Sequence, residues 1–306
     1  MQLFIKSCHA TLEYDQARMF HDMGYEVFGN FDIGSKQRKK IVGVTDKNSN
    51  IEDFNNIILH QTEDFDLVME SLLQKGKKVI LNAFGQGCDR QHINVSNLCK
   101  NYENAYVSSY SVKDFNLYIG FGCPREKIEM IRFGKYLDDF KPWKGKWPAC
   151  YISCNAIHRR GGGCGWETLQ ALEKAGLPII LSGNETADNS DFGMGELEEK
   201  AMHNVFSNAM CHLHLGTVPA PITLSLIEAF CSGTPVVAYN NQQGLINEGF
   251  EIDFYDDVQG LAHGIQKMIL DENFRKEQHR KSLRNAKYFN IHEVAPKWRT
   301  LLEKFK

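Results

Sequence analysis

The sequence predicts an α/β protein with two parallel-sheet domains, and three observations lead to that prediction. Short apolar runs alternate with amphipathic stretches along the chain of 306 residues, a pattern typical of parallel sheets with helices on both faces. The alternation breaks once, at 136–149, where two prolines, two tryptophans and three lysines occur without periodicity. It then restarts, and the length suits two domains of about 150 residues each.

In the first half, each predicted strand is a short apolar run, and each predicted helix has apolar residues at helical spacing. Leu12, Ala17, Phe20 and Met23 show this spacing before Gly24, where we expect the first helix to end. Strands are predicted at 2–7, 25–32, 39–44, 55–61, 77–84 and 105–111 and within 126–134, and helices at 12–24, 64–76 and 111–122.

The second half repeats the pattern after the linker. Strands are predicted at 149–154, 177–184, 210–216 and 235–240, a glycine-rich loop at 158–165, and helices at 166–176, 194–209, 222–232, 256–271, 272–289 and 291–305. Two sheets of parallel strands imply a ligand site at the carboxyl ends of the strands.

The composition is that of an ordinary globular protein, with 42% hydrophobic and 24% charged residues. The net charge of -3 does not indicate a basic nucleic-acid binder. The run "KQRKK" at 36–40 is interpreted as a solvated turn, with a phosphate-contacting patch as the alternative. The start of the chain lacks the pattern of a signal peptide, and no apolar stretch reaches 18 residues. We therefore expect a cytoplasmic protein without stable membrane insertion.

The sequence contains nine cysteines, an odd number that fits reduced thiols in a reducing compartment. Cys150, Cys154, His158 and Cys164 form a cluster of residue types that suit zinc. Their spacing lacks the paired Cys-x2-Cys of common structural zinc sites, so buried thiols are favoured and no metal site is predicted.

The glycine-rich stretch "HRRGGGCG" directly follows a predicted strand and precedes a predicted helix. Backbone NH groups at such a position face an anion, and glycines such as Gly163 permit close approach. Arg159 and Arg160 supply planar donors for phosphate. We expect a phosphate-binding loop, with a flexible surface loop carrying two solvated arginines as the alternative.

A second anion site is expected where the helix at 222–232 begins. Thr223, Leu224 and Ser225 would present the free NH groups of its first turn to a diphosphate. Glu228 lies about one turn further in, from where a carboxylate could accept two ribose hydroxyls. The alternative is a glutamate on an exposed helix face.

The stretch "SLIEAFCSGTPVVAYN" resembles the donor-binding helix and following strand of retaining GT-B glycosyltransferases, of the group 1 or family 4 kind. The segments "CPREKIEMIRFGKYLDDFKP", "ACYISCNAIHRRGGGCGWETLQAL" and "IILSGNE" and the closing helices resemble other parts of that family in the same order. The resemblance covers about 105–306 well and the first half in outline. It implies two Rossmann-like domains facing a cleft. These are an acceptor-side domain at 1–143 and a nucleotide-sugar domain at 144–290, with a helix at 291–306 that packs back on the first.

Roles carry over from the family residue by residue. Glu228 matches the acid that holds the ribose, and Thr223 to Ser225 match the helix start that binds the distal phosphate. Arg160 matches the phosphate-binding arginine, with Arg159 as a register alternative. The base or sugar pocket is assigned to Gly183, Asn184, Ala220 and Pro221.

Two positions depart from the family pattern. Cys164 stands where the family has a lysine, and the neighbouring arginine is expected to compensate. Ala220 stands where the family has its first acid, which contacts the donor sugar. This places the identity of the sugar and any nucleophile for a double displacement in question.

The first half should supply the acceptor side and the catalytic groups. His9 follows the first predicted strand, His60 ends another, and Asp89 follows a third. These three residues are the catalytic candidates, and Tyr110 is a weaker one. Each also has a structural alternative, since a histidine or aspartate at a strand end often serves only the fold.

The resemblance implies transfer of a sugar from a nucleoside-diphosphate sugar, most simply a UDP-sugar, to an acceptor hydroxyl. The transfer is expected to retain configuration and to need no metal or other cofactor. The acceptor that the resemblance implies is a glycan, a small molecule or a hydroxymethylated base of phage DNA, in the cytoplasm of a bacterial cell or of a phage-infected host. The alternatives are a nucleotide-sugar-binding protein without transferase activity and an epimerase of the same fold.

Overall fold

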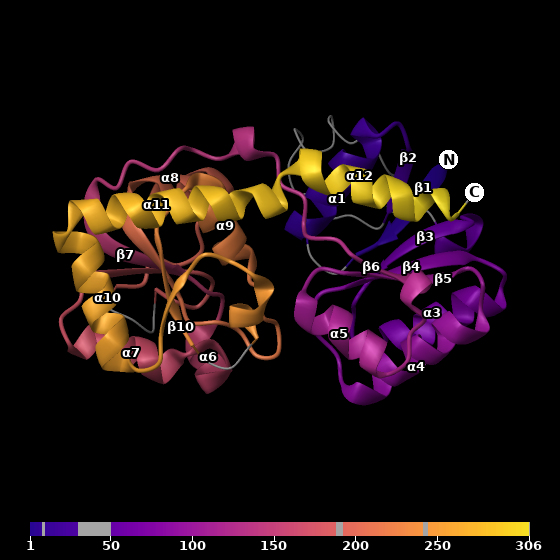
Figure 1. Cartoon of the computed structure of the whole chain (residues 1–306), viewed down its shortest axis with the longest axis horizontal. Coiled ribbons are helices and arrows are strands. Elements are labelled where there is room, and N and C mark those ends of the chain that lie inside the picture. The colour runs from indigo at the N-terminus through magenta and orange to yellow at the C-terminus, as the bar shows by residue number, and fades with distance from the viewer. Residues whose placement is uncertain (8–9, 30–49, 188–191, 241–243, 306) are drawn as a thin grey trace. The chain divides into compact units, whose positions relative to one another are not determined.

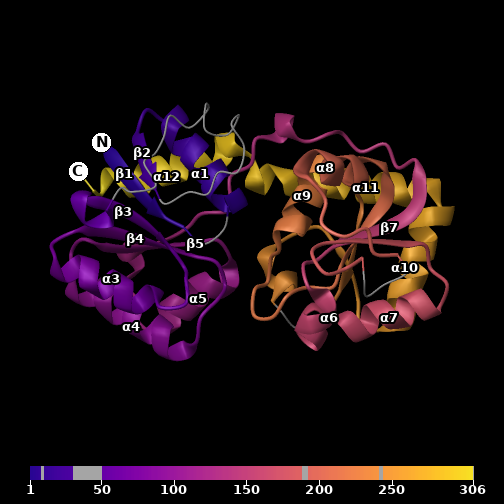
Figure 2. The same ribbon diagram turned by 180° about the vertical axis from the view of Figure 1, so that it is seen from behind.

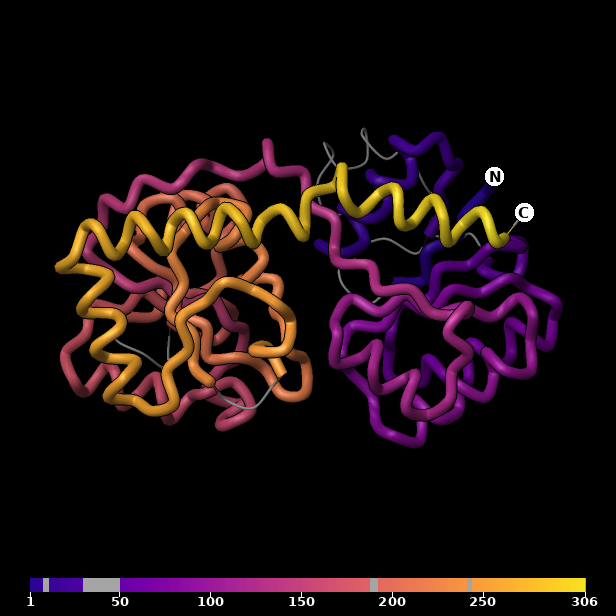
Figure 3. Tube along the Cα trace, in the orientation of Figure 1, coloured from indigo at the N-terminus to yellow at the C-terminus, as the bar shows by residue number. Residues whose placement is uncertain are grey.

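The structure is a computed structural model that describes residues 1–7, 10–29, 50–187, 192–240 and 244–305. It divides into two compact units, of which the first combines Met1–Lys135 with Asn290–Lys306 and the second is Tyr136–Phe289. The trace in Figure 3 shows that the C-terminal segment of the chain belongs to the same unit as the N-terminal segment.

The first unit contains a six-stranded sheet in the order β2-β1-β3-β4-β5-β6. Every pair of neighbouring strands is parallel. The strands are β1 (Gln2–Lys6), β2 (Glu26–Gly29), β3 (Asn56–His60), β4 (Lys78–Ala83), β5 (Ala105–Ser109) and β6 (Ile128–Met130).

Helices cover both faces of this sheet. α3 (Phe65–Gln74), α4 (Asp89–Asn101) and α5 (Val112–Gly120) lie on one face, and α1 (Ala10–Asp22) and α12 (Ile291–Glu303) lie together on the other (Figure 1). Phe20 of α1 and Trp298 of α12 meet edge to face at 5.2 Å between ring centroids. The last helix thus completes the hydrophobic layer of the first unit.

The second unit has a five-stranded parallel sheet in the order β11-β10-β9-β7-β8. Its strands are β7 (Trp147–Ser153), β8 (Ile179–Ser182), β9 (Ala209–His214), β10 (Val236–Tyr239) and β11 (Asp253–Tyr255). Figure 2 shows α6 (Ile157–Arg160), α7 (Trp166–Lys174) and α10 (Val258–Leu270) on one face and α8 (Glu199–Asn208), α9 (Leu224–Ser232) and α11 (Glu272–Ala286) on the other.

Short 3-10 turns join these elements. They are η1 (Ile51–Asp53), η2 (Arg125–Lys127), η3 (Leu137–Asp139), η4 (Gly161–Cys164), η5 (Leu245–Glu248) and η6 (Lys287–Phe289). Of these, η4 bears directly on the candidate site.

Each sheet has one place where neighbouring strands send their following helices to opposite faces. In the first unit this happens between β1, which leads to α1, and β3, which leads to α3. In the second unit it happens between β7, which leads to α6, and β9, which leads to α9. Ligands of open parallel sheets bind at such switch points, outside the carboxyl ends of the strands.

The predicted α/β class with two parallel sheets is confirmed, and most predicted elements match within a few residues. Four elements differ. The predicted helix at 194–209 begins only at Glu199, α4 and β11 were not predicted, and the glycine-rich "loop" at 158–165 is partly the helical turn α6 followed by η4. The predicted strand at 39–44 lies outside the described residues.

The physical reasons for these differences are local. α4 has a mean hydropathy too low to stand out, because its exposed face is densely polar. β11 is a three-residue edge strand, too short to show a period. In the glycine run, Gly161 and Gly165 adopt positive φ angles of 55° and 75°, which lets a tight helical turn form where three glycines suggested an open loop.

Candidate functional site

At the switch point of the second unit, the loop after β7 and the loop after β9 are joined by direct contacts. The Val218 NH donates to the Gly163 carbonyl at 2.8 Å, and the Cys164 Sγ lies 3.8 Å from the Thr217 Oγ1. A Cβ at Gly165 would stand 2.8 Å from the Cβ of Leu215, so only glycine fits there. These contacts hold the glycine run against the segment that leads into α9.

The two arginines of the glycine-rich stretch are both exposed but contact different neighbours. The Arg159 Nη2 lies 3.2 Å from the Glu185 Oε1, in the loop that follows β8. The Arg160 Nη1 lies 3.9 Å from the Cys154 Sγ, directly after β7. Arg160 is therefore the arginine that turns back toward the strand end, while Arg159 is engaged by a carboxylate.

The start of α9 is capped by its own side chains. The Thr223 Oγ1 accepts a hydrogen bond from the Leu226 NH at 3.2 Å, lies 3.0 Å from the Ser225 Oγ and 3.5 Å from the His214 Nδ1. Thr223, Leu224 and Ser225 are all half-buried. The helix dipole and the first-turn NH groups are oriented toward whatever occupies the space before Thr223.

Glu228 is buried inside α9, with only 5% of its surface exposed. The alternative of a glutamate on an exposed helix face is therefore wrong. Glu228 follows Leu224 and Ser225 by one helical turn and lies on the same face as they do. Burial raises the pKa of Tyr151 to about 12, and the charge of Glu228 adds to this effect. The Tyr151 hydroxyl lies 2.6 Å from the Ser182 Oγ at the end of β8.

Two buried histidines on β9 complete this polar layer. Burial lowers the pKa of His212 to about 3, with the nearby His214 adding to the effect, and burial lowers the pKa of His214 to about 4. Both are therefore neutral near pH 7. The His212 Nδ1 lies 3.0 Å from the Tyr151 carbonyl. Sequence reasoning missed both histidines, although their i, i+2 spacing places them on one face of a strand.

The residues assigned to a base or sugar pocket lie directly after β8 and in the segment between β9 and α9. Gly183 has a φ of 139°, and a Cβ there would lie 2.3 Å from the Cys154 carbonyl oxygen. The neighbouring Asn184 is exposed, and its NH donates to the Asn155 Oδ1 at 3.0 Å. Ala220 and Pro221 are buried, directly before α9.

In the first unit, the predicted catalytic residues occupy unlike surroundings. His60 is fully buried, with its Nδ1 3.0 Å from the Ser7 Oγ and its Nε2 2.6 Å from the Gln16 Oε1. Asp89 is exposed at the first turn of α4. His9 lies outside the described residues. The described part of the chain shows no contact between His60 and Asp89.

Tyr110, the weaker candidate, is 1% exposed and stacks on Phe133 at 4.8 Å between ring centroids. Its carbonyl accepts a hydrogen bond from the Arg132 Nη1 at 2.8 Å. These contacts are those of a core residue that fixes the turn after β5.

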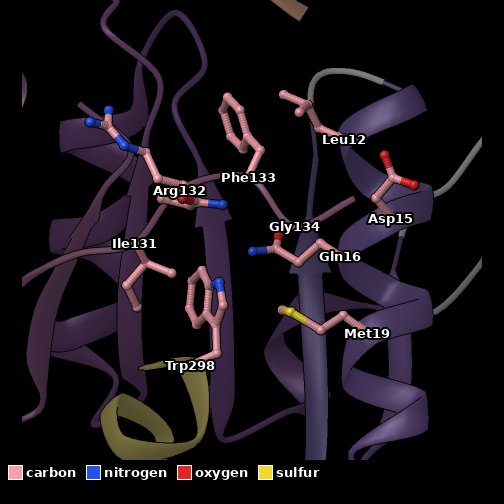
Figure 4. Close-up of a pocket in the computed structure, with 10 residues that line it drawn as sticks. Leu12, Asp15, Gln16, Met19, Ile131, Arg132, Phe133, Gly134 and Trp298 are labelled. Carbon is pink, nitrogen blue, oxygen red and sulfur yellow. The ribbon is translucent and has the colours of Figure 1, made fainter. Parts of the chain in front are cut away.

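A pocket of the first unit connects with the buried histidine through Gln16. Gln16 and Trp298 point into it from α1 and α12, with Arg132 at its edge (Figure 4). Asn82, near the end of β4, also lines it. His60 contacts the lining of this pocket through Gln16, which sequence reasoning did not single out.

Among the residues that the structure describes, no three His, Cys, Asp or Glu side chains come together as metal ligands would. In these ranges every helix is also too short or too polar to span a bilayer.

The strand order within each sheet and the likeness to solved structures define the class of fold. It is the GT-B fold, with two Rossmann-like units built on parallel sheets. No protein-family model matches the chain, and no curated protein is similar to it in sequence.

Solved structures share the fold over the full length of the chain. HepE from Anabaena, in complex with UDP-glucose, is 13% identical with a TM-score of 0.76, covering 100% of this chain and 99% of HepE. A sucrose-phosphate synthase from Thermosynechococcus elongatus is 14% identical with a TM-score of 0.72, covering 100% and 99% of the two chains. A glycosyltransferase from Rickettsia africae is 12% identical with a TM-score of 0.69, covering 100% and 98%.

Proposed function

We propose that this protein is a glycosyltransferase that moves a sugar from a UDP-sugar to an acceptor hydroxyl. The observation that carries the proposal is the set of contacts at the switch point of the second unit. There the glycine run is fastened to the segment before α9, and Glu228 is buried one turn inside that helix. The shared fold with solved glycosyltransferases supports the same conclusion.

The donor diphosphate is assigned to the first turn of α9 and to Arg160. The NH groups of Leu224 and Ser225 belong to the helix end that favours negative charge. Arg160 adds a planar cation from the opposite loop. Gly163 allows the backbone to approach the phosphates closely.

The ribose is assigned to Glu228, because this carboxylate lies one turn inside α9, on the same helix face as Leu224 and Ser225, and can accept hydrogen bonds from ribose hydroxyls. The base and the sugar then face Gly183 and Asn184 on one side and Ala220 and Pro221 on the other. The uracil base is favoured because HepE was solved with UDP and with UDP-glucose.

The chemistry follows from where charge develops. When the bond between the sugar and the diphosphate breaks, negative charge grows on the leaving phosphate, and fixed NH groups with Arg160 stabilise it without a metal ion. A front-face route, in which the leaving phosphate takes the proton of the acceptor hydroxyl, gives retention. Ala220 supplies no carboxylate, so a double displacement through that position has no nucleophile.

The acceptor is assigned to the first unit, and its chemical class stays open between a glycan, a small molecule and a hydroxymethylated DNA base. The basic run at 36–40, which would support a DNA acceptor, lies outside the described residues. His60, fully buried, is best placed to act through Gln16, and Asp89 is the exposed candidate.

Titration calorimetry of the full chain with UDP, ADP, GDP and inorganic pyrophosphate tests the donor assignment. We expect UDP to bind in the micromolar range and the other compounds at least tenfold more weakly. Binding stabilises the fold by mass action, so a thermal-shift measurement should rank them in the same order. If none of the four binds, the assignment of the donor site is wrong.

A second assay separates the transferase from a binding protein without activity. We expect slow hydrolysis of UDP-glucose or of another UDP-sugar, because a catalytic donor site activates water in place of the acceptor. Tight UDP binding with no hydrolysis of any UDP-sugar would favour the binding protein.

A further inference from the structure

A groove runs along the outer edge of the sheet in the second unit. β11 lies at this edge, and among the described strands only β10 pairs with it, so β10 separates the groove from the strands of the switch point. Residues 252–255 line the groove together with His263 and Lys267 of α10 and Phe274 of α11. Its volume of about 500 Å³ falls within the range of ligand-binding sites in proteins.

The residues that line the groove show that it follows the edge of β11 and not one face of the sheet. Successive side chains of a strand point to opposite faces, so a cavity over one face would be lined by alternate residues. Here four consecutive residues, 252–255, line it. The groove therefore runs where a further strand would pair with β11.

The backbone of Phe254 faces this groove. β11 pairs with β10 in parallel, and the Asn240 NH donates to the Tyr255 carbonyl at 2.8 Å. In a parallel pair, the NH and C=O groups of every second residue bond to the same neighbouring strand, so those of Phe254 point away from β10. Within the described part of the chain, neither group has a hydrogen bond. Phe254 thus offers one donor and one acceptor to a further strand.

Aromatic rings form the walls beside this edge. The Tyr255 ring lies against α10, where a Cβ at Gly264 would stand 2.5 Å from the Tyr255 Cζ. The Lys267 Nζ lies 4.1 Å from the centroid of the Phe274 ring, a cation–π contact that keeps this ammonium at the groove. When a peptide adds to a sheet edge, backbone hydrogen bonds bind it and side-chain contacts select it. The rings supply the contacts for apolar side chains.

The free charge in the groove is positive. Of the lining residues, Asp253 is the one carboxylate, and both its oxygens are engaged, Oδ1 by the Lys281 ammonium and Oδ2 by the Gln278 Nε2 at 2.6 Å. Lys267 and His263 are exposed, lie one turn apart on α10 and form no ion pair among the described residues. An acidic segment is therefore favoured over a basic one.

We propose that the groove beside β11 is a docking site for an extended acidic segment of a partner protein, which joins the sheet as a sixth strand. The backbone of this segment bonds to the NH and C=O groups of Phe254, and its apolar side chains lie against Tyr255 and Phe274. A carboxylate of the segment pairs with Lys267. The docking site uses no residue that is assigned to the donor, so it stands or falls independently of the proposed function.

Fluorescence anisotropy with the full chain and labelled synthetic peptides tests the docking site. The probe is a peptide of about ten residues in which valine and glutamate alternate, a pattern that suits an extended strand. One matched peptide has lysine in place of glutamate. Another carries N-methyl groups on its central residues, which removes backbone donors and keeps every side chain. We expect saturable binding of the acidic probe and at least about tenfold weaker binding of both matched peptides. Equal binding of the probe and the N-methylated peptide overturns the added strand.

Two variants of Phe254 separate its backbone from its ring. F254P removes the NH that faces the groove and leaves the ladder to β10, which does not use that NH. F254A removes the ring and keeps the NH. We expect F254P to bind the probe at least about tenfold more weakly than F254A does, and equal binding by the two variants overturns the proposal. Circular dichroism checks that F254P is folded, and if it is not, the N-methylated peptide tests the same hydrogen bonds from the side of the ligand.

K267E tests the charge of the groove. We expect it to weaken binding of the acidic probe at least about tenfold. The matched control K287E makes the same change of charge at an exposed position of η6, outside the groove, and should keep the affinity of the unaltered chain. Unchanged binding in K267E, or no binding of the probe to the unaltered chain, overturns the proposal. Sedimentation that shows a dimer of this chain, disrupted in K267E, also overturns it, because a second copy then occupies the groove.

Discussion

Lys135 and Asp15 form a buried ion pair, with the Lys135 Nζ 2.6 Å from the Asp15 Oδ2 and side chains only 3% and 13% exposed. Asp15 belongs to α1, and Lys135 is the last residue of the first unit before the chain leaves it. The Lys135 carbonyl also accepts from the Ile291 NH at 2.9 Å, where the chain returns. The pair therefore lies where the chain leaves the first unit and where it returns to that unit.

Lys135→Met should destabilise the first unit strongly, because it removes the cation that lies 2.6 Å from the Asp15 carboxylate in largely buried surroundings. Breaking a buried pair on one side costs about 3–5 kcal/mol. Urea unfolding measures the loss. The control is Lys75→Met, which breaks the exposed pair with Glu52 at 2.5 Å and should leave the free energy of unfolding nearly unchanged, because exposed ion pairs contribute little. Equal losses in the two variants would show that the buried pair has no special role.

Glu228→Ala and Arg160→Ala should each reduce turnover of the UDP-sugar more than 100-fold, about 3 kcal/mol of transition-state stabilisation. The physical reason is loss of the ribose ligand in the first variant and of a phosphate cation in the second. Steady-state kinetics measure both. Arg280→Ala removes an arginine that is 63% exposed on α11 and should leave turnover unchanged. Near-normal turnover in both test variants would exclude the assigned donor site.

Thr223→Ala should lower the stability of the second unit by about 1 kcal/mol, the usual contribution of a helix N-cap. It should also weaken UDP binding, because the cap orients the first turn of α9. The matched control is Asp271→Ala, which removes the cap of α11, where the Asp271 Oδ1 accepts from the Phe274 NH at 2.9 Å. We expect Asp271→Ala to lose a similar amount of stability and to keep its UDP affinity. Equal UDP affinity in the two variants would contradict the role of the Thr223 cap in UDP binding.

The sequence was sufficient for the fold because apolar periodicity and glycine punctuation are local signals. It also singled out Glu228 and Thr223 as candidates, since a helix start and a lone acid in an apolar helix can be recognised along the chain. The ion pair of Arg159 with Glu185 depends on loops that meet only after the sheet forms. The Gln16–His60 contact likewise joins α1 to β3, and no spacing along the chain predicts it.

Gly183→Ala should prevent stable folding of the second unit, whereas Gly176→Ala should cost about 1–3 kcal/mol from its positive φ alone. Both glycines have positive φ angles, 139° and 74°. A Cβ at Gly183 would lie 2.3 Å from the Cys154 carbonyl oxygen, whereas nothing lies within 4 Å of one at Gly176. Soluble yield and the thermal unfolding midpoint measure the difference. Two equally stable variants would contradict the close approach of β7 and β8 at this end of the sheet.

The second unit should lose stability as the pH falls from about 6.5 to about 4. Burial lowers the pKa of His212 to about 3 and that of His214 to about 4, so the folded state binds fewer protons than the unfolded state in this window. Above pH 6.5 both states hold neutral histidines and the penalty is absent. Each histidine should cost about 2 kcal/mol by pH 5.

Unfolding in urea at pH 7 and pH 5 measures this loss. His212→Asn and His214→Asn should each reduce the difference between the two pH values, because the variant no longer gains a proton on unfolding. His292→Asn, at an exposed position at the start of α12, is the control and should keep the full difference. If the His292 variant changes the pH dependence as much as the other two, the buried histidines of β9 are not its source.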